Sequence, residues 1–370
     1  MKNSIKLFKN KMKCLPWIML AKYGFYKGNK EPIKFIIEDA DWAIKFLGEN
    51  IKREIDIIAP GKLEVSVKPH KSIESIVHFG SQYMWLNWGK HMSTKNQYIT
   101  SFFHGKPEDG EDVKTHLNLF LESVERLEKV VTASSLIEQR LLKWGVPKNK
   151  LIKIPLGVNT SFFNLPKRDE INRIRNLIGI PSHSIVIGSF QKDGIGWKDG
   201  FLPKLIKGPD LFVSTLKILA SKGYPVFALL TGPARGYVKH ELETSGIPYY
   251  HTYLSNHNDL KALYHALDIY LITSREEGGP MGLLESIASG IPVVTTNVGM
   301  AMDVIEDGKT GAISDEITPK SISDKVEKII QMSSREKYQL QKNARKHISK
   351  FDWKIIAEQH FKKVYKPLMS

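Results

Sequence analysis

The sequence predicts an α/β protein with two doubly wound domains, because one pattern recurs in both halves of the chain. Short apolar runs, each followed by a segment with helical periodicity, alternate along the sequence. Runs that are apolar throughout, instead of alternating with polar residues, are typical of strands buried on both faces of a parallel sheet. A length of 370 residues exceeds what one hydrophobic core usually serves, so two domains are expected.

The first half contains four apolar runs that we expect to form strands. They lie at residues 33–38, 75–80, 97–105 and 129–134. A helix is expected over residues 112–127, where apolar residues recur at alternating spacings of four and three. This stripe consists of Val113, Leu117, Phe120, Val124 and Leu127. Ser135 and Glu138 have the spacing of a capping box, which predicts the start of another helix.

The second half repeats the pattern more regularly. The expected strands lie at residues 184–190, 225–232, 268–274 and 292–297. The expected helices lie at residues 209–222, 235–245, 258–266 and 281–289. This strand and helix alternation favours a doubly wound parallel sheet.

Pro155 and Gly157 interrupt both patterns near residues 154–164, which places the domain boundary there. The expected parts of the chain are a basic N-terminal segment, 1–31, a first domain, 32–160 with the C-terminal helix 353–370, and a second domain, 161–352. We expect the two domains to face each other across a cleft, because open parallel sheets bind ligands beyond the carboxyl ends of their strands.

The net charge of +15 is unevenly distributed. Residues 1–30 carry eight lysines and no acidic residue, interleaved with apolar side chains such as Phe8 and Trp17. One interpretation is an amphipathic segment that lies on an anionic membrane surface. The other is a helix that packs on the first domain and exposes a lysine face. Pro16 interrupts a short apolar centre, Lys22 follows at once and no small-x-small cleavage pattern is evident, which argues against a signal peptide.

Several classes of protein are excluded. The basic residues are spread along the chain without a zinc-finger, helix-turn-helix or RNP pattern, so nucleic-acid binding is not expected. The single cysteine, Cys14, excludes a disulfide scaffold and fits a reducing compartment. No apolar run approaches the roughly 18–20 residues of a membrane span. We therefore expect a cytoplasmic protein, attached at most to the inner face of the membrane.

The stretch "ITSREEGGPMGLLESIASGIPVV" places acidic residues and glycines at the start of a helix. Glu276 and Glu277 follow the strand at 268–274, and Glu285 comes about a turn or more into the helix. Pro280 suits a first helical turn, where its missing amide hydrogen has no cost. Backbone amides at such a helix start bind phosphate, and glycine allows the close approach that a ligand needs. The amides in question are those of Gly278, Gly279, Met281 and Gly282.

Carboxylates beside an anion site suit a ligand that carries hydroxyls as well as phosphate. A nucleotide sugar has both: its diphosphate would meet the amides, and its ribose and sugar would meet the two glutamates Glu285 and Glu277. The alternative is that both glutamates only cap the helix. Glu276 is expected to be an exposed neighbour without a function.

Positive charge is expected at the same sheet edge. Lys207 precedes Gly208 at another helix start, and Lys192 follows the strand at 184–190. Surface lysines are usually only solvated, but these two stand at the ends of strands of one sheet, where ligands bind.

These residues resemble the second domain of the family 4 (group 1) retaining glycosyltransferases, which have the GT-B fold of two Rossmann-like domains. The Glu-x7-Glu signature of that family stands here as Glu277 to Glu285, and "IPLGVNTSFF", "KGPDLFV", "LLTGPARGYVKHEL" and "LKALYHALDIYLITSREE" also match. The resemblance covers residues 154–366 well and residues 33–153 in outline.

The resemblance implies roles for the matching residues. Glu277 would contact the transferred sugar near the reacting centre, and Glu285 would hold the ribose. The donor diphosphate and sugar would be lined by Gly278, Gly279, Pro280, Met281, Gly282 and Leu283. Lys207 would be the phosphate lysine of the family. His104 in "SFFHG" would face the donor sugar from the first domain, the alternative being an ordinary buried histidine.

The sequence departs from the family pattern in two places. The arginine expected after the first strand of the second domain is absent from "GSFQKDGIGWKDG", where Lys192 is a candidate substitute without the bidentate fork of arginine. The glycine-rich loop after the first strand of the chain is replaced by "EDADWA". Asp39, Asp41 and Trp42 of that segment belong either to the acceptor side or to packing.

The implied reaction is that of a hexosyltransferase: a sugar moves from a nucleotide-diphosphate sugar to the hydroxyl of a glycan or glycolipid acceptor, with retention of configuration. The acceptor would belong to cell-surface polysaccharide or lipopolysaccharide synthesis. No Asp-x-Asp motif stands in a suitable place and lysines supply positive charge, so no metal and no cofactor are expected. The alternatives are another enzyme on this architecture, such as a nucleotide-sugar epimerase, and a binding protein without activity.

Overall fold

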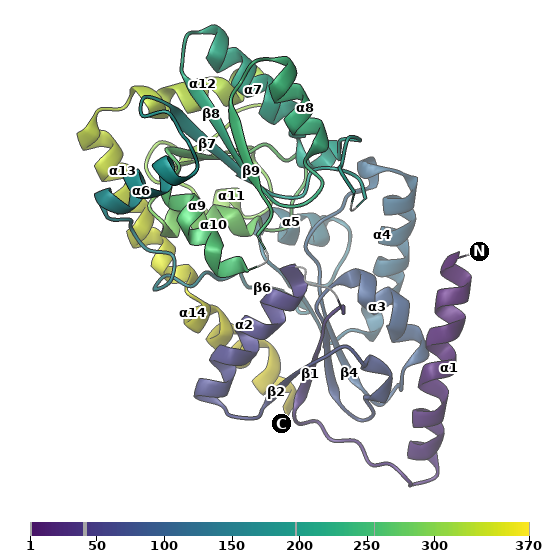
Figure 1. The fold of residues 1–370 in the computed structure, drawn as a ribbon. Helices are drawn as coiled ribbons and strands as arrows, with labels where there is room; N and C mark the ends of the chain where they lie inside the picture. The colour runs from purple at the N-terminus through teal and green to yellow at the C-terminus, as the bar shows by residue number, and fades with distance from the viewer. Residues whose placement is uncertain (1, 40–42, 197, 255, 370) are drawn as a thin grey trace. The chain divides into compact units, whose positions relative to one another are not determined.

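The computed structural model describes residues 2–39, 43–196, 198–254 and 256–369, so Asp41 and Trp42 lie outside the described residues. The chain divides into two compact units (Figure 1). Unit 1 comprises Met1–Gly157 and Trp353–Ser370, and unit 2 comprises Val158–Asp352. Each unit contains a six-stranded parallel sheet, which confirms the predicted fold class of two doubly wound α/β domains.

The sheet of unit 1 has the strand order β2-β1-β3-β4-β5-β6. Its strands are β1 (Ile33–Ile36), β2 (Leu63–Ser66), β3 (Ile76–Phe79), β4 (Gln97–Ser101), β5 (Lys129–Thr132) and β6 (Leu151–Lys153). The four predicted strands are confirmed. The two that were not predicted, β2 and β6, are the edge strands, and their partly exposed residues interrupt the apolar runs.

Both faces of this sheet are buried. Ile33 and Phe35 of β1 pack in one apolar cluster, whereas Ile36 packs in another. Val130 and Val131 of β5 divide between the two clusters in the same way. Because successive strand residues point to opposite faces, a sheet covered on both sides requires the continuous apolar runs that predicted it.

Helices surround the sheet of unit 1. They are α1 (Lys2–Lys22), α2 (Ala43–Ile58), α3 (Gln82–Trp88), α4 (Glu111–Ser123), α5 (Ser135–Lys143), α14 (Trp353–Gln359) and α15 (Lys366–Met369). The predicted helix at 112–127 is confirmed as α4 with a following 3-10 turn, Val124–Arg126. The prediction that Ser135 caps α5 is wrong by one residue, because the Ser134 hydroxyl accepts the hydrogen bond from the amide of Ile137, at 3.3 Å.

The sheet of unit 2 has the strand order β12-β11-β10-β7-β8-β9. Its strands are β7 (Ile185–Phe190), β8 (Val226–Thr231), β9 (Tyr249–Thr252), β10 (Ile269–Ile272), β11 (Val293–Thr295) and β12 (Ala312–Ile313). The four inner strands were predicted, and the two edge strands were not. From β7 the chain first builds one half of the sheet, through β8 and β9, and then starts the other half at β10. The order therefore reverses between β7 and β10, where an open α/β sheet binds its ligand.

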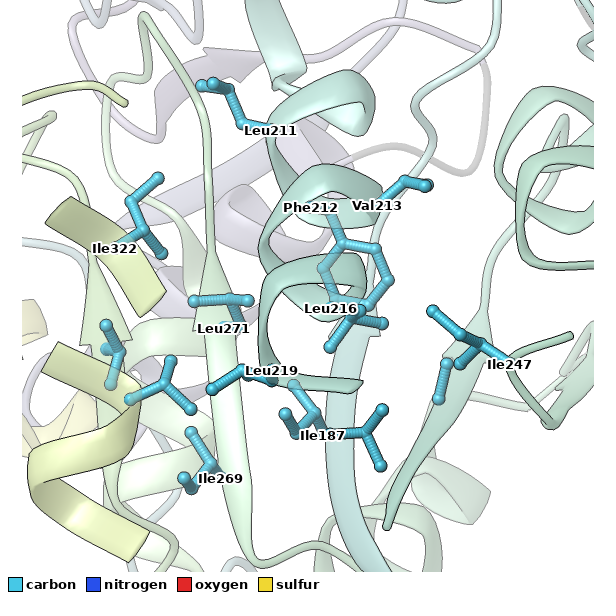
Figure 2. Packing of buried hydrophobic residues seen from close by; sticks show 14 of the residues in the cluster. Ile187, Leu211, Phe212, Val213, Leu216, Leu219, Ile247, Ile269, Leu271 and Ile322 are labelled. Atoms are coloured by element: carbon cyan, nitrogen blue, oxygen red, sulfur yellow. The ribbon is translucent and has the colours of Figure 1, made fainter. Parts of the chain in front are cut away.

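Helices also cover the second sheet. They are α6 (Arg168–Leu177), α7 (Pro209–Ser221), α8 (Gly236–Thr244), α9 (Leu260–His265), α10 (Met281–Ala288), α11 (Ala301–Val304), α12 (Pro319–Gln331) and α13 (Ser334–Ile348). Figure 2 shows α7 against the sheet, with Phe212, Leu216 and Leu219 in the same buried cluster as Ile187 of β7 and Leu271 of β10. This packing fixes the start of α7 relative to the ends of β7 and β10.

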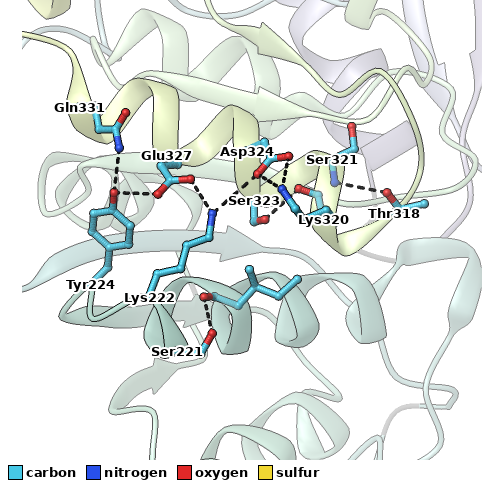
Figure 3. A network of polar contacts seen from close by, with 11 residues as sticks. Ser221, Lys222, Tyr224, Thr318, Lys320, Ser321, Ser323, Asp324, Glu327 and Gln331 are labelled. Atoms are coloured by element: carbon cyan, nitrogen blue, oxygen red, sulfur yellow. Dashed lines mark hydrogen bonds and ion pairs between the residues drawn. The ribbon is translucent and has the colours of Figure 1, made fainter.

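A polar network joins the C-terminal end of α7 to α12 (Figure 3). The Lys222 ammonium lies 2.6 Å from Glu327 and 3.7 Å from Asp324. The hydroxyl of Tyr224 donates to Glu327 at 2.9 Å. Solvent screens such exposed ion pairs, so the packing beneath them holds the two helices together. In the part of the chain that is described, no helix has both the length and the apolar character of a membrane span.

Candidate functional site

The acidic turn connects β10 to α10 at the carboxyl edge of the sheet of unit 2. The helix α10 begins at Met281, as predicted, and Pro280 is its N-cap instead of a residue of its first turn. A Cβ on Gly282 would lie 2.3 Å from the hydroxyl oxygen of Tyr270 in β10. Gly282 therefore allows α10 to pack closely on the strand, and packing alone requires glycine at this position, whether or not its amide binds a ligand.

Glu277 and Lys207 lie together in the structure. The Lys207 ammonium contacts Oε1 of Glu277, and the Ser274 hydroxyl donates to the same oxygen at 3.1 Å. Lys207 ends a short 3-10 turn, Leu205–Lys207, just before α7, whereas Glu277 lies in the turn after β10. Two residues that were predicted separately, 70 positions apart, thus form one charged pair at the sheet edge.

Backbone contacts hold these two segments together. Gly208 has a φ of +64°, and a Cβ at this position would lie 1.9 Å from the carbonyl oxygen of Thr273. The Thr273 hydroxyl donates to the carbonyl of Gly208 at 2.7 Å, and Arg275 forms a bidentate pair with Asp210 at 2.8 and 2.6 Å. Only glycine combines this left-handed conformation with such a close approach. The position of Lys207 therefore depends on Gly208.

The prediction that Glu276 is exposed is wrong. Glu276 retains 4% of its accessible surface. The turn folds back on the segment before α7, and the amides of Arg275 and Glu276 donate to the carbonyl of Ile206 at 2.8 and 3.3 Å. A pattern of consecutive acidic residues does not reveal this burial, because the covering segment lies about 70 residues earlier in the chain.

Glu285 is buried on α10 and is held by two residues that the sequence did not identify. The Tyr264 hydroxyl donates to Oε2 at 2.9 Å, and Nε2 of His257 lies 3.0 Å from Oε1. Tyr264 belongs to α9, and His257 to the 3-10 turn that precedes it. Each carboxylate oxygen has a second lone pair, so Glu285 retains the capacity to accept ribose hydroxyls. Its role in ribose binding stays a prediction.

The contact between His257 and Glu285 predicts a pH-dependent contribution to stability. Burial lowers the pKa of His257, but the hydrogen bond and the negative charge of Glu285 outweigh burial and raise this pKa above 6.5. A raised folded-state pKa gives a contribution that is fully present below about pH 6.5 and is lost as the pH rises through the folded-state pKa.

The variant His257→Gln should therefore lose stability at pH 6 and match the parent protein at pH 9. The loss should stay under about 1 kcal/mol, because the imidazole is 39% exposed and solvent screens the pair. Urea unfolding at the two pH values measures the difference. His240→Gln, at an exposed position of α8, is the matched control and should show no such pH dependence. Equal losses at both pH values would contradict the assignment.

Lys192 lies two residues after the end of β7, at the same sheet edge as Lys207, and is partly exposed. The stretch "QKDGIGWKDG" just after β7 contains no arginine, but the guanidinium of Arg235 lies at this strand end. It donates to the carbonyls of Ser189 and Gln191 at 3.0 and 2.8 Å, and it lies 3.3 Å from the Asp193 carboxylate. Arg235 is buried, so its guanidinium does not face solvent; its hydrogen bonds hold the backbone next to Lys192 in place. Its position just after β8, in "TGPARG", is a strand-end signal that could have identified it.

His104 lies in unit 1, just after β4. Its side chain is exposed, so the alternative of an ordinary buried histidine is wrong. The Gln82 amide donates to the His104 carbonyl at 3.1 Å and holds the backbone of this loop. That His104 contacts a donor sugar stays a prediction. Asp39 is also exposed.

No group of three or more histidine, cysteine, aspartate or glutamate side chains is placed to hold a metal ion among the residues that the structure describes. What the site of unit 2 does contain is two lysines, two carboxylates and the amino end of an eight-residue helix. Such an arrangement can bind a ligand that carries both phosphates and hydroxyls.

Comparisons with known proteins identify relatives of this site. Residues 201–347 match the family model described as glycosyl transferases group 1. The capsular polysaccharide biosynthesis glycosyltransferase CapM of Staphylococcus aureus is 28% identical over 168 residues, which are 43% of this chain and 43% of CapM. The lipopolysaccharide core biosynthesis mannosyltransferase LpsB of Rhizobium meliloti is 32% identical over 116 residues, 29% of this chain and 33% of LpsB.

The structural comparison extends over nearly the whole chain. HepE of Anabaena, solved in complex with UDP and glucose, superposes with a TM-score of 0.72 at 16% identity, covering 91% of this chain and 100% of HepE. At this identity the likeness concerns the fold. The chain spans about half the length of the curated relatives that it matches.

Proposed function

We propose that this chain, whose residues 201–347 belong to the glycosyl transferases group 1 family and whose fold is GT-B, transfers a sugar from a nucleotide-diphosphate sugar to an acceptor hydroxyl. The reaction is that of a retaining family 4 hexosyltransferase and needs no metal ion. The acceptor is a glycan or glycolipid of a cell-surface polysaccharide or lipopolysaccharide. The names of CapM and LpsB and the UDP bound to HepE support this proposal.

The observation that carries the proposal is the pair formed by Lys207 and Glu277 beside the amino end of α10. The strand order reverses at this position, which is where an open α/β sheet binds its ligand. A lysine ammonium has three donors, so Lys207 can keep its contact with Glu277 while it donates to a phosphate oxygen. One site then holds both the diphosphate and the hydroxyls of the sugar.

The chemistry follows from the charges. When the bond between the sugar and the diphosphate breaks, negative charge grows on the leaving phosphate and positive charge grows on the sugar. Lys207, Lys192 and the first amides of α10 stabilise the leaving group electrostatically, which is the task that a metal ion performs elsewhere. Glu277 stabilises and orients the sugar through its hydroxyls and forms no covalent bond to it.

A donor panel tests the proposal. The unfolding temperature of the protein is measured with nucleotide-diphosphate sugars that differ in base and sugar, and only the true donor should raise it strongly. That donor, at 100 times its Kd, should stabilise the protein by about 2.7 kcal/mol. Free nucleotide diphosphate should then be released from that donor only when an acceptor is present. Release without transfer, or conversion of the donor into another nucleotide sugar, would contradict the proposal.

We further propose that residues 1–30 attach the protein to the inner face of an anionic membrane. One face of α1 packs on unit 1, where Cys14 and Asn10 are buried and the Asn10 amide donates to the carbonyl of Asn87 at 3.0 Å. The alternative interpretation expects the other face of α1 to expose only lysines. That face instead exposes an apolar stripe, with residues at spacings of three and four. This stripe consists of Ile5, Phe8, Met12, Leu15 and Met19.

Lysines flank this stripe, as is typical of helices that lie in the interface of an anionic bilayer. The buried, free thiol of Cys14 fits a protein of the reducing cytoplasm. The double variant Phe8→Ser with Met12→Ser should remain in the supernatant when the parent protein sediments with vesicles of phosphatidylcholine and phosphatidylglycerol.

Leu119→Ser, an equally exposed position on α4 of the same unit, is the control and should sediment like the parent protein. Raising the salt concentration should weaken sedimentation, because the attraction of lysines to the lipid surface is screened. Sedimentation of the double variant to the same extent, or a parent protein that stays in solution, would remove the membrane proposal.

A further inference from the structure

Unit 2 contains a cavity of about 630 Å³ at the amino edge of its sheet. The wall includes Ile185 and Ile269, the first residues of β7 and β10, and Pro292, which directly precedes β11. The acidic turn with Glu277 lies at the opposite, carboxyl edge of this sheet, and β7 spans about 17 Å between its two ends. The cavity is therefore separate from the acidic turn, and its volume suits a small organic molecule.

Hydrogen bonds between segments far apart in the chain hold the walls of this cavity. On one side, Nε of Arg175 in α6 donates to the carbonyl of Ala266, at the end of α9, at 2.9 Å. On another side, the side-chain amide of Gln341 in α13 donates to the carbonyl of Gly290, just after α10, at 2.9 Å. These bonds join α6 to α9 and α13 to α10, so the shape of the cavity is built into the fold.

Apolar side chains form a large part of the wall. Leu267 and Ile291 are buried, Ile171 and Ile330 are partly buried, and all four line the cavity. Side chains around a space of this size meet water on one side, whereas an apolar molecule in the cavity would remove their surface from water. The wall thus fits a ligand with an apolar body.

The wall also carries more positive than negative charge, from Arg175, Lys337 and Asp268. Nη2 of Arg175 lies 2.9 Å from Oδ1 of Asp268, and the amide of Val186 donates to Oδ2 at 2.8 Å, so this carboxylate is compensated. The Lys337 ammonium donates to the carbonyl of Ile330 at 3.0 Å and forms no ion pair with any residue that the structure describes. The wall therefore has a surplus ammonium group, which favours an anionic ligand.

Two further polar residues line the cavity, His265 and Ser289. Nδ1 of His265 lies 3.2 Å from the Glu170 carboxylate, and Nε2 donates to the carbonyl of Asn164 at 2.8 Å, so both ring nitrogens face protein groups. The Ser289 hydroxyl is fully buried and has no hydrogen-bond partner in the described part of the chain. An unpartnered buried hydroxyl is rare in folded proteins and marks a position where a water or a ligand atom is expected.

We propose that this cavity binds a small organic anion, a molecule with an apolar body and a single carboxylate or sulfonate group. The body lies against the apolar wall. The anionic group contacts the Lys337 ammonium, which has three donors and gives one of them to Ile330. The site differs from the donor site in its position and in its ligand, so this inference does not rest on the proposed function.

The experiment uses anilinonaphthalene sulfonate, which has an aromatic body and one sulfonate and whose fluorescence rises in apolar surroundings. Phenylnaphthylamine has the same body without the charge and is the neutral comparison. In fluorescence titrations of the full chain, Lys337→Met should bind the sulfonate at least about tenfold more weakly than the parent protein, because a charge-assisted contact is lost. Both proteins should bind the neutral compound equally. The control is Lys342→Met, at an exposed position of the same helix, which should bind the sulfonate like the parent protein.

A second pair of variants tests the position of the site. Ile171→Trp places a larger side chain in the wall and should weaken the binding of both compounds, whereas Asn172→Trp, at the exposed neighbouring position of α6, should not. Saturating UDP should leave the binding of both compounds unchanged, because the acidic turn lies at the other edge of the sheet. Urea unfolding shows whether each variant is folded, and if Ile171→Trp is not, the comparison of Lys337→Met with Lys342→Met decides alone.

Four results would overturn the proposal. The first is sulfonate binding by Lys337→Met that equals that of Lys342→Met, since the net charge of the protein would then explain the attraction. The second is binding of the neutral compound as tight as that of the sulfonate. The third is unchanged binding by a folded Ile171→Trp variant. The fourth is displacement of the sulfonate by UDP, which would place the probe in the donor site.

Discussion

Replacing Glu277 by glutamine should lower kcat for sugar transfer by about 10²–10³-fold, the usual effect of removing one group that stabilises charge in a transition state. The Glu277 carboxylate is held in place by Lys207 and Ser274, so it is positioned before the donor binds. Glutamine keeps the shape of the side chain but removes the negative charge that faces the developing positive charge on the sugar. The measurement is steady-state transfer from the donor identified by thermal shift.

The neighbouring residue supplies the matched control. Glu276→Gln changes a carboxylate in the same turn that is buried against the segment before α7, and it should retain most of the activity. Binding of UDP should be nearly unchanged in both variants. If Glu277→Gln kept full activity, or if both variants lost activity equally, Glu277 would have no direct part in the reaction.

Replacing Arg235 by methionine should lower the free energy of unfolding by about 3–5 kcal/mol, because it leaves a buried carboxylate without its counter-charge. Asp193 and Arg235 are both buried. Both carboxylate oxygens of Asp193 lack a hydrogen-bond partner among the described residues, and the guanidinium at 3.3 Å supplies their charge compensation. Urea unfolding of unit 2, followed by circular dichroism, measures the loss.

Two further variants make this prediction specific. Replacing both members of the buried pair, with Asp193→Leu and Arg235→Met together, should recover much of the lost stability, since no charge is then buried alone. Lys222→Met removes one member of the exposed pair with Glu327 (Figure 3) and should change the stability little, because solvent screens that pair. A loss in Arg235→Met as small as that in Lys222→Met would show that the Asp193 carboxylate is not desolvated.

Sequence patterns predicted the inner strands well for a physical reason. A strand such as β8 is buried on both faces and therefore has no polar residue in "VFALL". An edge strand such as β9, "YYHT", is only partly buried, and its residues carry no comparable signal. The helix start at Met281 was also close to prediction, because glycine and proline have conformational preferences that act locally.

The parts of the site that were missed depend on contacts between segments far apart in the chain. Nothing in the sequence around Glu285 indicates that Tyr264 and His257 bind it, since the three residues meet only when α9 packs beside α10. Burial of Glu276 likewise depends on the segment that contains Ile206. The exposure of Phe201 and Leu202 was missed because apolar residues predict a core position, and only the fold shows that these two face solvent.

The division of unit 1 into two stretches of chain has a consequence for biosynthesis. Trp353, Ile356 and Tyr365 belong to the same apolar cluster as Phe35 and Ile33 near the other end of the chain. A ribosome that adds about 5–20 residues per second delivers all of unit 2 before this last piece of unit 1. Unit 2 can therefore fold while unit 1 still exposes one face of its sheet. During that interval unit 1 is the part of the nascent chain that chaperones are expected to bind.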